Sequence, residues 1–482
     1  MDHDARAQNA GEGTTRRRYL GLISIIASFC PSSQHPLLQS VSKPRSFILL
    51  IGRRRPSQHT TSHPARRGSM AGSDDYSVDE ARAQFPALQQ QQVFFDNAGG
   101  SQVLGSVVDS IRDYFTTANV QLGASYAVGQ RATARYDAAH DAGARFVNAR
   151  SDEVVFGPST TQLLRNLSLA LGGPGSRLRP GDDIVVSAID HEANVAPWVD
   201  LADRHDLVLK WWRPAAAAAA HDTNPKLLPE DLARLVGPRT RLVTFTHASN
   251  ILGTITDVRA VADVAHAVGA LVCVDGVAYA PHRPIDVAAL GVDFYCFSWY
   301  KTYGPHVAML YAGWAAQTHL RSLGHFFNPS ATLADKLGLA GGSYELCQAV
   351  THVVDYLGPG TGSEKWRAIE AHEHQLQAVL LDFLTARPDV TIFGVAKPDS
   401  HLRVSTVSFA VDGWDPKALV EAVEKDTRFA FRWGAFYSNR LVRDTLRLGP
   451  NGVVRVSMVH YNTLDEVKGL IKALEKVIDG KE

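Results

Sequence analysis

The sequence has few cysteines and no long apolar run. Its 482 residues include four cysteines, Cys30, Cys273, Cys296 and Cys347, and no pair of them forms a CxxC motif. This usage argues against a disulfide scaffold or a zinc site and fits a reducing compartment, so we expect a cytoplasmic protein with no bound metal. No hydrophobic stretch reaches the roughly 20 residues that a membrane-spanning helix requires.

The chain also lacks an excess of either charge. It contains 49 Lys and Arg residues and 49 Asp and Glu residues, so its formal net charge is +0. A balanced charge gives no electrostatic reason to bind nucleic acid or an anionic membrane, and we expect neither as a partner. The length is ample for a large core and for two or more domains.

Acidic residues are absent from residues 14–70, which contain arginine triplets at 16–18 and 53–55 and many serines. An Arg-rich, acid-poor start is typical of an organelle transit peptide, which makes a mitochondrial location the alternative to the cytoplasm. Two other interpretations are a disordered extension and a true start at Met70. In each case we expect residues 1–72 to lie outside the folded domains, and we expect residues 1–69 to be dispensable for the site described below.

Apolar runs alternate with helical patterns between residues 153 and 311, which predicts a mostly parallel sheet covered by helices. The expected strands are 153–156, 183–187, 242–246, 270–274, 294–298 and 307–311. A long amphipathic helix at 364–385 follows, and then short strands and helices that predict a smaller α+β domain. We interpret the alanine run at 215–220 as a surface insertion.

An acid and a lysine stand at the ends of two of these apolar runs. The run 270–274 leads into Asp275, and the run 294–298 is followed by Lys301. Ligands of open α/β sheets bind at such strand ends. Pyridoxal 5'-phosphate suits this pair, because a lysine amine can bond its aldehyde and a carboxylate can keep its ring nitrogen protonated. The alternative is a buried Asp–Lys ion pair with a structural role.

The text between these two residues carries a family resemblance. The stretch VDGVAYAPHRPIDVAALGVDFYCFSWYKTYGP closely resembles the cofactor segment of class V aminotransferases, which include the cysteine desulfurases. The resemblance extends over residues 76–478 and implies the pyridoxal-phosphate-dependent transferase fold, type I. It implies an N-terminal segment at 73–105 that packs on the small domain, a large cofactor-binding domain at 106–360 and a small C-terminal domain at 361–482. It also implies a homodimer with shared active sites.

Further loops match the family's cofactor motifs. The strand-to-helix junction GPSTTQ, by its free amides and hydroxyls, is a candidate anion site, although an ordinary capped helix has the same appearance. DHEANVAPW resembles the family's EHHANxxPW, and HASNILG resembles HVSNVLG. The resemblance assigns the cofactor to Lys301, Asp275, His191, Thr160, Thr161, Asn250, Ser298, Tyr300 and Ser343. His191 would stack on the ring and move protons, and Ser343 would reach the phosphate of the neighbouring subunit.

Substrate-binding residues are implied in the same way. VVRVS followed by YNT resembles the family's xRASxxxYNT, so Arg455 would hold a substrate carboxylate by two parallel hydrogen bonds. Asn194 and Arg432 are further candidates for substrate binding. Lys301 and His191 are the candidate catalytic residues, and the expected substrate is an amino acid.

One loop departs from the desulfurase pattern. Desulfurases carry their sulfur-accepting cysteine in a loop of the form RxGxHCA, whereas this chain reads RWGAFYS, with Tyr437 at the cysteine position. A phenol cannot accept sulfane sulfur. We therefore predict an enzyme that acts at the α- or β-carbon of an amino acid, as a lyase or in a desulfurase-like reaction without a persulfide. The alternatives are a class V aminotransferase, an amino-acid epimerase, a desulfurase with a distant cysteine, and a non-catalytic binding protein.

Overall fold

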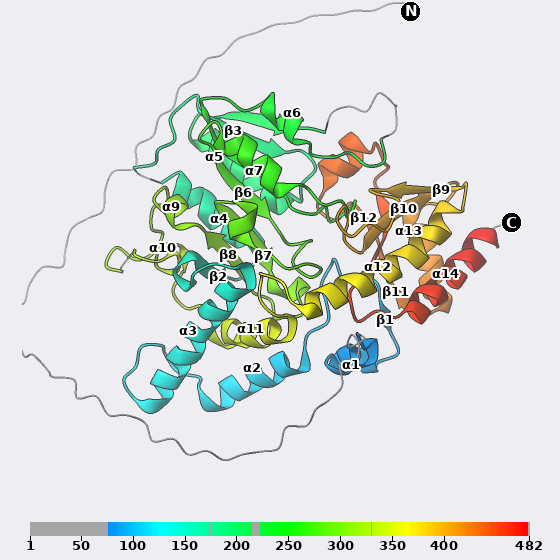
Figure 1. Ribbon diagram of the computed structural model, residues 1–482, viewed down its shortest axis with the longest axis horizontal. Coiled ribbons are helices and arrows are strands. Elements are labelled where there is room, and N and C mark those ends of the chain that lie inside the picture. The colour runs from blue at the N-terminus through cyan, green and yellow to red at the C-terminus, as the bar shows by residue number, and fades with distance from the viewer. Residues whose placement is uncertain (1–75, 174, 215–221, 329, 481–482) are drawn as a thin grey trace, which may run out of the picture. The chain divides into compact units, whose positions relative to one another are not determined.

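The computed structural model describes residues 76–173, 175–214, 222–328 and 330–480 (Figure 1). The predicted extension at 1–72 and the alanine run at 215–220 lie outside the described residues. Residues 72–482 cluster into one compact unit. The division of this unit into a large and a small domain therefore stays a prediction.

The central element is a seven-stranded sheet in the order β2-β8-β7-β6-β5-β3-β4. Its strands are β2 (Val154–Gly157), β3 (Asp183–Ser187), β4 (Val208–Trp212), β5 (Thr240–Thr246), β6 (Leu271–Asp275), β7 (Phe294–Ser298) and β8 (Ala308–Ala312). β8 runs antiparallel to both of its neighbours, and the remaining pairs are parallel. The predicted mostly parallel sheet is confirmed.

Buried side chains alternate between the two faces of this sheet. Val243 and Val272 join one apolar core, and Leu242 and Cys273 join the other. This alternation follows from the two-residue period of a strand. Since both faces are covered, the strands read as continuous apolar runs in the sequence. The helices between them are α4 (Thr160–Leu171), α5 (Ala196–Arg204), α6 (Pro229–Ala233), α7 (Val258–His266) and α8 (Val287–Leu290).

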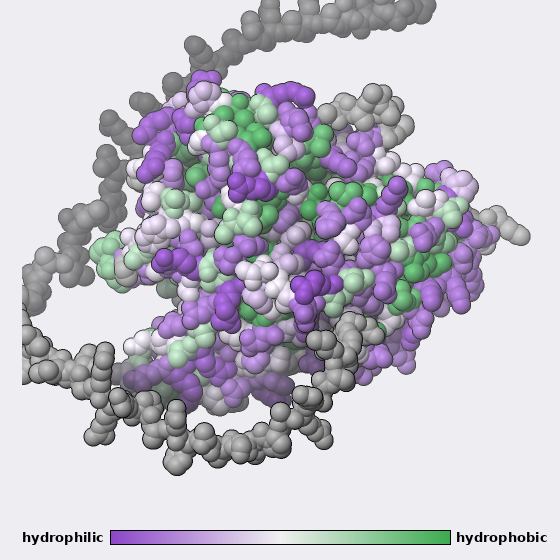
Figure 2. Space-filling model, viewed as in Figure 1, coloured by the Kyte–Doolittle hydropathy of each residue, from purple (hydrophilic) through white to green (hydrophobic). Residues whose placement is uncertain are grey.

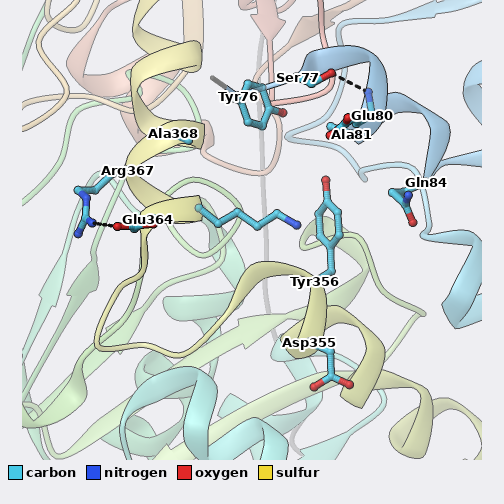
Figure 3. Close-up of a pocket in the computed structure, with 11 residues that line it drawn as sticks. Tyr76, Ser77, Glu80, Ala81, Gln84, Asp355, Tyr356, Glu364, Arg367 and Ala368 are labelled. Atoms are coloured by element: carbon cyan, nitrogen blue, oxygen red, sulfur yellow. Dashed lines mark hydrogen bonds and ion pairs between the residues drawn. The ribbon is translucent and has the colours of Figure 1, made fainter. Parts of the chain in front are cut away.

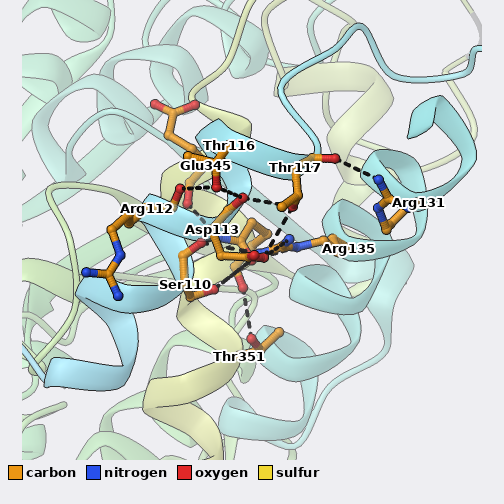
Figure 4. A network of polar contacts seen from close by, with 10 residues as sticks. Ser110, Arg112, Asp113, Thr116, Thr117, Arg131, Arg135, Glu345 and Thr351 are labelled. Atoms are coloured by element: carbon orange, nitrogen blue, oxygen red, sulfur yellow. Dashed lines mark hydrogen bonds and ion pairs between the residues drawn. The ribbon is translucent and has the colours of Figure 1, made fainter.

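Three helices pack together at one side of the sheet: α2 (Gly105–Thr117), α3 (Ala127–Val147) and α11 (Tyr344–Leu357). A polar network joins them (Figure 4). The Arg135 guanidinium donates to Asp113 at 2.6 Å and to the Gln348 side chain at 2.9 Å, which also accepts from the Ser110 hydroxyl at 2.9 Å. One arginine therefore holds all three helices in register.

A four-stranded antiparallel sheet in the order β12-β13-β10-β9 forms a second structural region. Its strands are β9 (Val390–Phe393), β10 (Thr406–Val411), β12 (Arg432–Gly434) and β13 (Val453–Ser457). It shares an apolar core with α12 (Glu364–Thr385), α13 (Pro416–Asp426) and α14 (Leu464–Asp479), which lie beside it in Figure 1. The predicted helix at 364–385 and the short strands after it are confirmed.

The segment before α2 contacts this second region. β1 (Val93–Phe94) pairs in parallel with β11 (Phe429–Ala430), and Asp96 forms a bridge with Ser457. These contacts carry the residues after β1 next to β13. The remaining elements are α1 (Val78–Ala83), η1 (Pro86–Gln89), η2 (Ser151–Glu153), η3 (Glu192–Asn194), η4 (Trp299–Lys301), α9 (Trp314–Gln317), α10 (Leu333–Leu337) and the π-helical turn η5 (Arg440–Thr445).

The surface carries hydrophilic and hydrophobic residues intermixed on the face that Figure 2 shows. Within the described ranges, none of the helices combines the length and the apolar character needed to cross a bilayer.

Candidate active site

A cavity lies where β6, β7 and the start of α4 meet. About 500 Å³ of space free of protein atoms lies in it, part of which is open solvent. Eight of the residues predicted from the sequence line it: Thr160, Thr161, His191, Asn250, Asp275, Ser298, Tyr300 and Lys301. Segments that are more than 100 residues apart in the sequence therefore meet in one place.

Lys301 ends η4, directly after β7, and faces this cavity. Among the described residues, its amine forms no hydrogen bond or ion pair; its nearest aromatic neighbour is the Tyr300 ring, 5.6 Å away. Burial lowers the pKa of Lys301 to about 8, and the positive charge of Arg455 acts in the same direction while Asp275 opposes it. An amine with this pKa is partly neutral near pH 7.5 and therefore nucleophilic.

Asp275 is the last residue of β6 and is buried. Its side chain accepts a hydrogen bond from the Val277 amide at 2.9 Å. Burial raises the pKa of Asp275 to about 6, because the loss of water around the carboxylate destabilises its ionised form. Gly276 is required next to it, because a Cβ there would lie 2.1 Å from the Tyr295 ring.

The junction between β2 and α4 forms the other end of the cavity. The Thr160 and Ser298 hydroxyls lie 2.8 Å apart, and the Ser159 hydroxyl caps α4 by accepting from the Gln162 amide. Thr160 begins α4, so the positive end of a twelve-residue helix points at these hydroxyls. This donor set suits a phosphate group.

His191 lies on the opposite side of the cavity, at the start of η3. Its Nδ1 accepts a hydrogen bond from the Ala193 amide at 3.1 Å, which leaves the proton of the neutral ring on Nε2. Burial lowers the pKa of His191 to about 4, so the ring is neutral at pH 7. The ring centroid of Tyr437 is 5.3 Å away.

Asn194 was predicted to bind substrate, but the structure places it in the core instead. Its amide donates to Asp190 at 2.7 Å, and its carbonyl oxygen accepts from the Trp198 indole at 3.0 Å and from the Thr244 hydroxyl at 2.8 Å. The side chain is fully buried and does not line the cavity. On the turn of η3, Asn194 points inward while His191 faces the cavity.

The structure reveals a second buried carboxyl group that the sequence did not predict. Asp190 also accepts from the Thr246 amide at 3.1 Å, and Thr246 pairs with Asp275 in the sheet. Burial raises the pKa of Asp190 to about 8, and the charge of Asp275 acts in the same direction. The motif DHEAN contains Asp190, but the sequence does not show that this acid lies close to Asp275.

Asn250 lines the cavity as predicted, but a loop occupies its amide group. Its side-chain nitrogen donates to the Phe436 carbonyl at 3.0 Å, and its side-chain oxygen accepts from the Ser438 hydroxyl at 2.9 Å. The loop at 434–439 contains the sequence that resembles the cysteine-bearing loop of desulfurases. It is also held by the Glu192 amide, which donates to the Tyr437 carbonyl at 2.8 Å, and by an ion pair between Glu192 and Arg440.

Arg455 and Arg432, the two arginines predicted to bind substrate, lie together beside this loop. Arg455 is buried and forms an ion pair with Asp96 at 2.9 Å. Arg432 is exposed and reaches the other oxygen of Asp96 at 3.3 Å. The ring of Phe436 lies on the Arg455 guanidinium, 3.6 Å from its Cζ. Asp96 and Phe436 were not predicted to be part of the site.

Ser343 does not line the cavity. It is exposed and forms the N-cap of α11. Its predicted contact with the cofactor of a neighbouring subunit stays a prediction.

The cysteines of the described residues are all buried: Cys273, Cys296 and Cys347. Burial raises the pKa of Cys347 to about 12 and moves the pKa values of the other two thiols upward as well. A buried thiol with a raised pKa forms little thiolate, which is the reactive form.

A larger, more open hollow lies between α1, α11 and α12 (Figure 3). Lys365 lines it, with its amine 3.4 Å from the centroid of the Tyr356 ring, and burial lowers the pKa of Lys365 to about 8. No strand ends there, and none of the predicted site residues reaches it. Size alone therefore does not identify the site.

Comparison with known proteins agrees with this geometry. Residues 93–470 match the aminotransferase class-V family. The chain belongs to this family. Its relatives include the aminotransferase-like protein FGM3 of Gibberella zeae, which is 50% identical over 84% of this chain and 100% of the relative. The cysteine desulfurase-like protein ustD of Aspergillus flavus is 37% identical over 83% of this chain and 90% of the relative.

A solved structure of a family member shares the fold. The cysteine desulfurase CsdA of Escherichia coli superposes with a TM-score of 0.72, at 26% sequence identity, over 84% of this chain and 99% of that one. The class V aminotransferase is therefore a pyridoxal-phosphate-dependent enzyme of fold type I, as the resemblance implied. Its family acts on amino acids.

The residues of the cavity fit this cofactor. Lys301 offers an amine that has no hydrogen-bond partner in the described part of the chain. Asp275 offers a buried carboxylate for the ring nitrogen, and the start of α4 offers hydroxyls and a positive helix end for the phosphate. These groups come from neighbouring strand ends, where a single small molecule can reach all of them.

Proposed function

We propose that this member of the aminotransferase class-V family is an amino-acid lyase that acts at the α- or β-carbon without a thiol relay. The loop at 434–439 carries the supporting observation: Tyr437 stands at the position of the desulfurase cysteine, with its ring 5.3 Å from the His191 ring. The three described cysteines are buried and have raised pKa values, so none of them offers a thiolate to the cavity.

Each residue of the cavity has a role in this proposal. The bound cofactor supplies an electron sink for the substrate's α-carbon, which Asp275 sustains by holding the ring nitrogen protonated. Lys301 takes the proton from the α-carbon, since its lowered pKa leaves part of the amine neutral at pH 7.5. His191 is neutral and carries its proton on Nε2, so it can donate that proton to a leaving group.

A homodimer is part of the same proposal. Ser343 lies on an exposed Gly-rich turn before α11, far from the cavity of its own chain. Ser343 can contribute to an active site only if a second copy of the chain places its own Ser343 turn beside the cofactor phosphate of the first copy. Sedimentation at several concentrations of holoenzyme tests this part, and a monomer at all concentrations would contradict it.

The reaction is tested with β-chloro-L-alanine, which carries a good leaving group at the β-carbon. We expect the holoenzyme to release pyruvate, ammonia and chloride in equal amounts, which is the signature of β-elimination. When the unmodified enzyme is incubated with L-cysteine, we expect no sulfur to become bound to the protein. The Cys347→Ser variant should turn over β-chloro-L-alanine at the same rate as the unmodified enzyme. Tyr437→Cys, which places an exposed thiol on the loop, should acquire protein-bound sulfur. Bound sulfur in the unmodified enzyme, lost in Cys347→Ser, would contradict the proposal.

A further inference from the structure

The guanidinium of Arg455 is buried but only partly satisfied. Its Nη1 donates to the Asn250 carbonyl at 3.2 Å, and its Nη2 donates to Asp96 Oδ1 at 2.9 Å. Its Nε is buried and has no hydrogen-bond partner among the described residues. An arginine binds a carboxylate best when two neighbouring N–H groups donate to its two oxygens. On the Nε–Nη2 edge of Arg455, one of these two bonds is missing.

Asp96 is shared between two arginines. Its Oδ1 accepts from buried Arg455, and its Oδ2 lies 3.3 Å from Nη1 of Arg432, whose side chain is 56% exposed. Asp96 therefore has a second cationic partner at the solvent side. If it leaves Arg455, its charge does not become isolated.

Phe436 closes the flat side of the same guanidinium. Its ring centroid lies 3.6 Å from Arg455 Cζ and 5.3 Å from Arg432 Cζ. The Phe436 backbone has a φ of 47°, which is unusual for a residue with a side chain, and Asn250 holds its carbonyl. Phe436 therefore blocks this face of Arg455 to a ligand, and Asp96 lies at the edge of the guanidinium.

We propose that Asp96 is a placeholder for the carboxylate of the amino-acid substrate, which replaces it on the Nε–Nη2 edge of Arg455. This inference rests on the proposed function in one respect, namely that the substrate is an amino acid. The incoming carboxylate forms two charge-assisted hydrogen bonds where Asp96 forms one. Asp96 then remains paired with Arg432.

Such an exchange keeps the buried arginine paired in both states. A buried cation without a partner strongly destabilises the folded protein. Without Asp96, Arg455 would lack an anionic partner whenever no substrate is bound. It also makes the site selective, because only an anionic planar group can take the place of a carboxylate. Amino-acid amides and amines without a carboxylate should bind weakly.

Asp96→Asn tests the exchange in the holoenzyme. The probe is L-alanine, which has no β-leaving group, and its binding is followed by the change in the cofactor's visible spectrum. Removing the charge of the competing group should lower the dissociation constant of L-alanine by about fivefold or more. The dissociation constant of L-alaninamide, which lacks the carboxylate, should not change. Asp263→Asn is the matched control, because it removes one carboxylate from an exposed Asp–Arg pair on α7.

The opposite sign would overturn the inference. If Asp96 only holds Arg455 in position, Asp96→Asn will weaken the binding of L-alanine, and an unchanged constant would equally exclude a placeholder. Should Asp96→Asn fail to fold, Arg432→Gln tests the same exchange: displaced Asp96 then has no second partner, and L-alanine should bind about fivefold more weakly with L-alaninamide unaffected. Unchanged binding in that variant would also overturn it. Because L-alanine undergoes no elimination, these results do not depend on whether the lyase proposal holds.

Discussion

The cavity has two regions, here called the floor and the roof, and different kinds of contact hold each of them in place. The floor consists of Asp275, Lys301 and the start of α4, which lie at strand ends of one buried sheet. Asp275 accepts from the nearby Val277 amide, and the Thr160 hydroxyl contacts the Ser298 hydroxyl. The roof is the loop at 434–439 with Arg455, and it is held by contacts that cross from the four-stranded sheet to the seven-stranded one. The floor contains residues that match the family's cofactor motifs, and the roof contains the loop whose sequence differs from the desulfurase motif.

The difference assigns separate tasks to the two regions. A covalent cofactor needs fixed groups, which the buried sheet provides because β6 and β7, the strands that lead to Asp275 and Lys301, are each paired on both sides. Selection of a substrate requires groups that can change partners, and the roof has these in the ion pairs of Asp96 and in the hydrogen bonds of Asn250. Substitutions in the floor should therefore abolish the reaction, and those in the roof should mainly alter binding and loop motion.

The largest effect is expected from Lys301→Ala. Loss of this amine should remove the covalent link to the cofactor and reduce turnover at least about 1000-fold. The measurements are the visible absorbance of the purified protein and the rate of pyruvate release. Lys365→Ala is a matched control, since burial lowers the pKa of Lys365 to about 8 as well, but this lysine lines the separate hollow of Figure 3. If Lys365→Ala lost the absorbance and Lys301→Ala retained it, the floor would be misassigned.

Features fixed by local sequence could be predicted, and those fixed by distant contacts could not. Asp275 follows an apolar run, and Thr160 stands at a strand-to-helix junction, so each position was evident from its neighbours. The ion pair of Asp96 with Arg455 joins residues 359 positions apart, and the hydrogen bond of Asn250 with Phe436 joins residues 186 positions apart. Neither contact can be recognised from the neighbouring sequence.

Two features of the structure were not evident from the sequence, because each depends on which way side chains face. Asn194 shares a motif with His191, but the sequence does not show which side of a short turn each side chain takes. The edge strand β4 was missed because it is only partly buried. Val208 is exposed, and the charged Lys210 interrupts the apolar run in the sequence. In the structure, Lys210 forms an ion pair with Asp183 at 2.5 Å. Edge strands have one face or side in water and so lack the continuous apolar run of inner strands.

The second prediction concerns Asp275→Asn. The substitution should weaken cofactor binding about 100-fold, because the ring nitrogen loses its anionic partner. It should also stabilise the cofactor-free protein at pH 7, where the buried carboxylate is ionised. The pKa of Asp275 rises from 3.8 to about 6 on folding, so the folded state binds its proton more tightly than the unfolded state. By linkage this contributes up to about 3 kcal/mol of destabilisation above pH 6.

The pH dependence gives the sign of this effect. Asp275 contributes a loss of stability as the pH rises from about 4 to about 6, and Asp190, whose pKa is raised to about 8, contributes a loss from about pH 4 to about pH 8. His191, whose pKa is lowered to about 4, contributes a gain over the lower part of this range. Asp275→Asn should remove only the Asp275 contribution, so its stability relative to the unmodified protein should rise between pH 4 and pH 6. Urea unfolding of the cofactor-free protein at several pH values measures this. An equal slope in both proteins would show that Asp275 is not strained by burial.

The third prediction moves to the roof. Asn250→Ala removes the two hydrogen bonds that hold the Phe436 carbonyl and the Ser438 hydroxyl. The loop should open more often, and amide hydrogen exchange at Glu192, which donates to Tyr437, should accelerate about tenfold. Exchange in α14 should not change, because that helix belongs to a separate core. A uniform acceleration would indicate global destabilisation instead of loop opening.

The smallest effect is expected from Arg440→Met. Arg440 pairs with Glu192, but both side chains are partly exposed, at 33% and 40%. Solvent screening limits such a pair to about 0–1 kcal/mol. Methionine also removes the guanidinium that lies 5.0 Å from the centroid of the Trp211 ring, a contact worth about 0.5–1 kcal/mol at an exposed site. We expect exchange at the Glu192 amide to rise no more than about threefold, and this rise should vanish in 0.5 M salt, at about a 4 Å screening length. If Arg440→Met opened the loop as far as Asn250→Ala does, the roof would be held mainly by charge, and binding of any carboxylate substrate would become strongly salt-dependent.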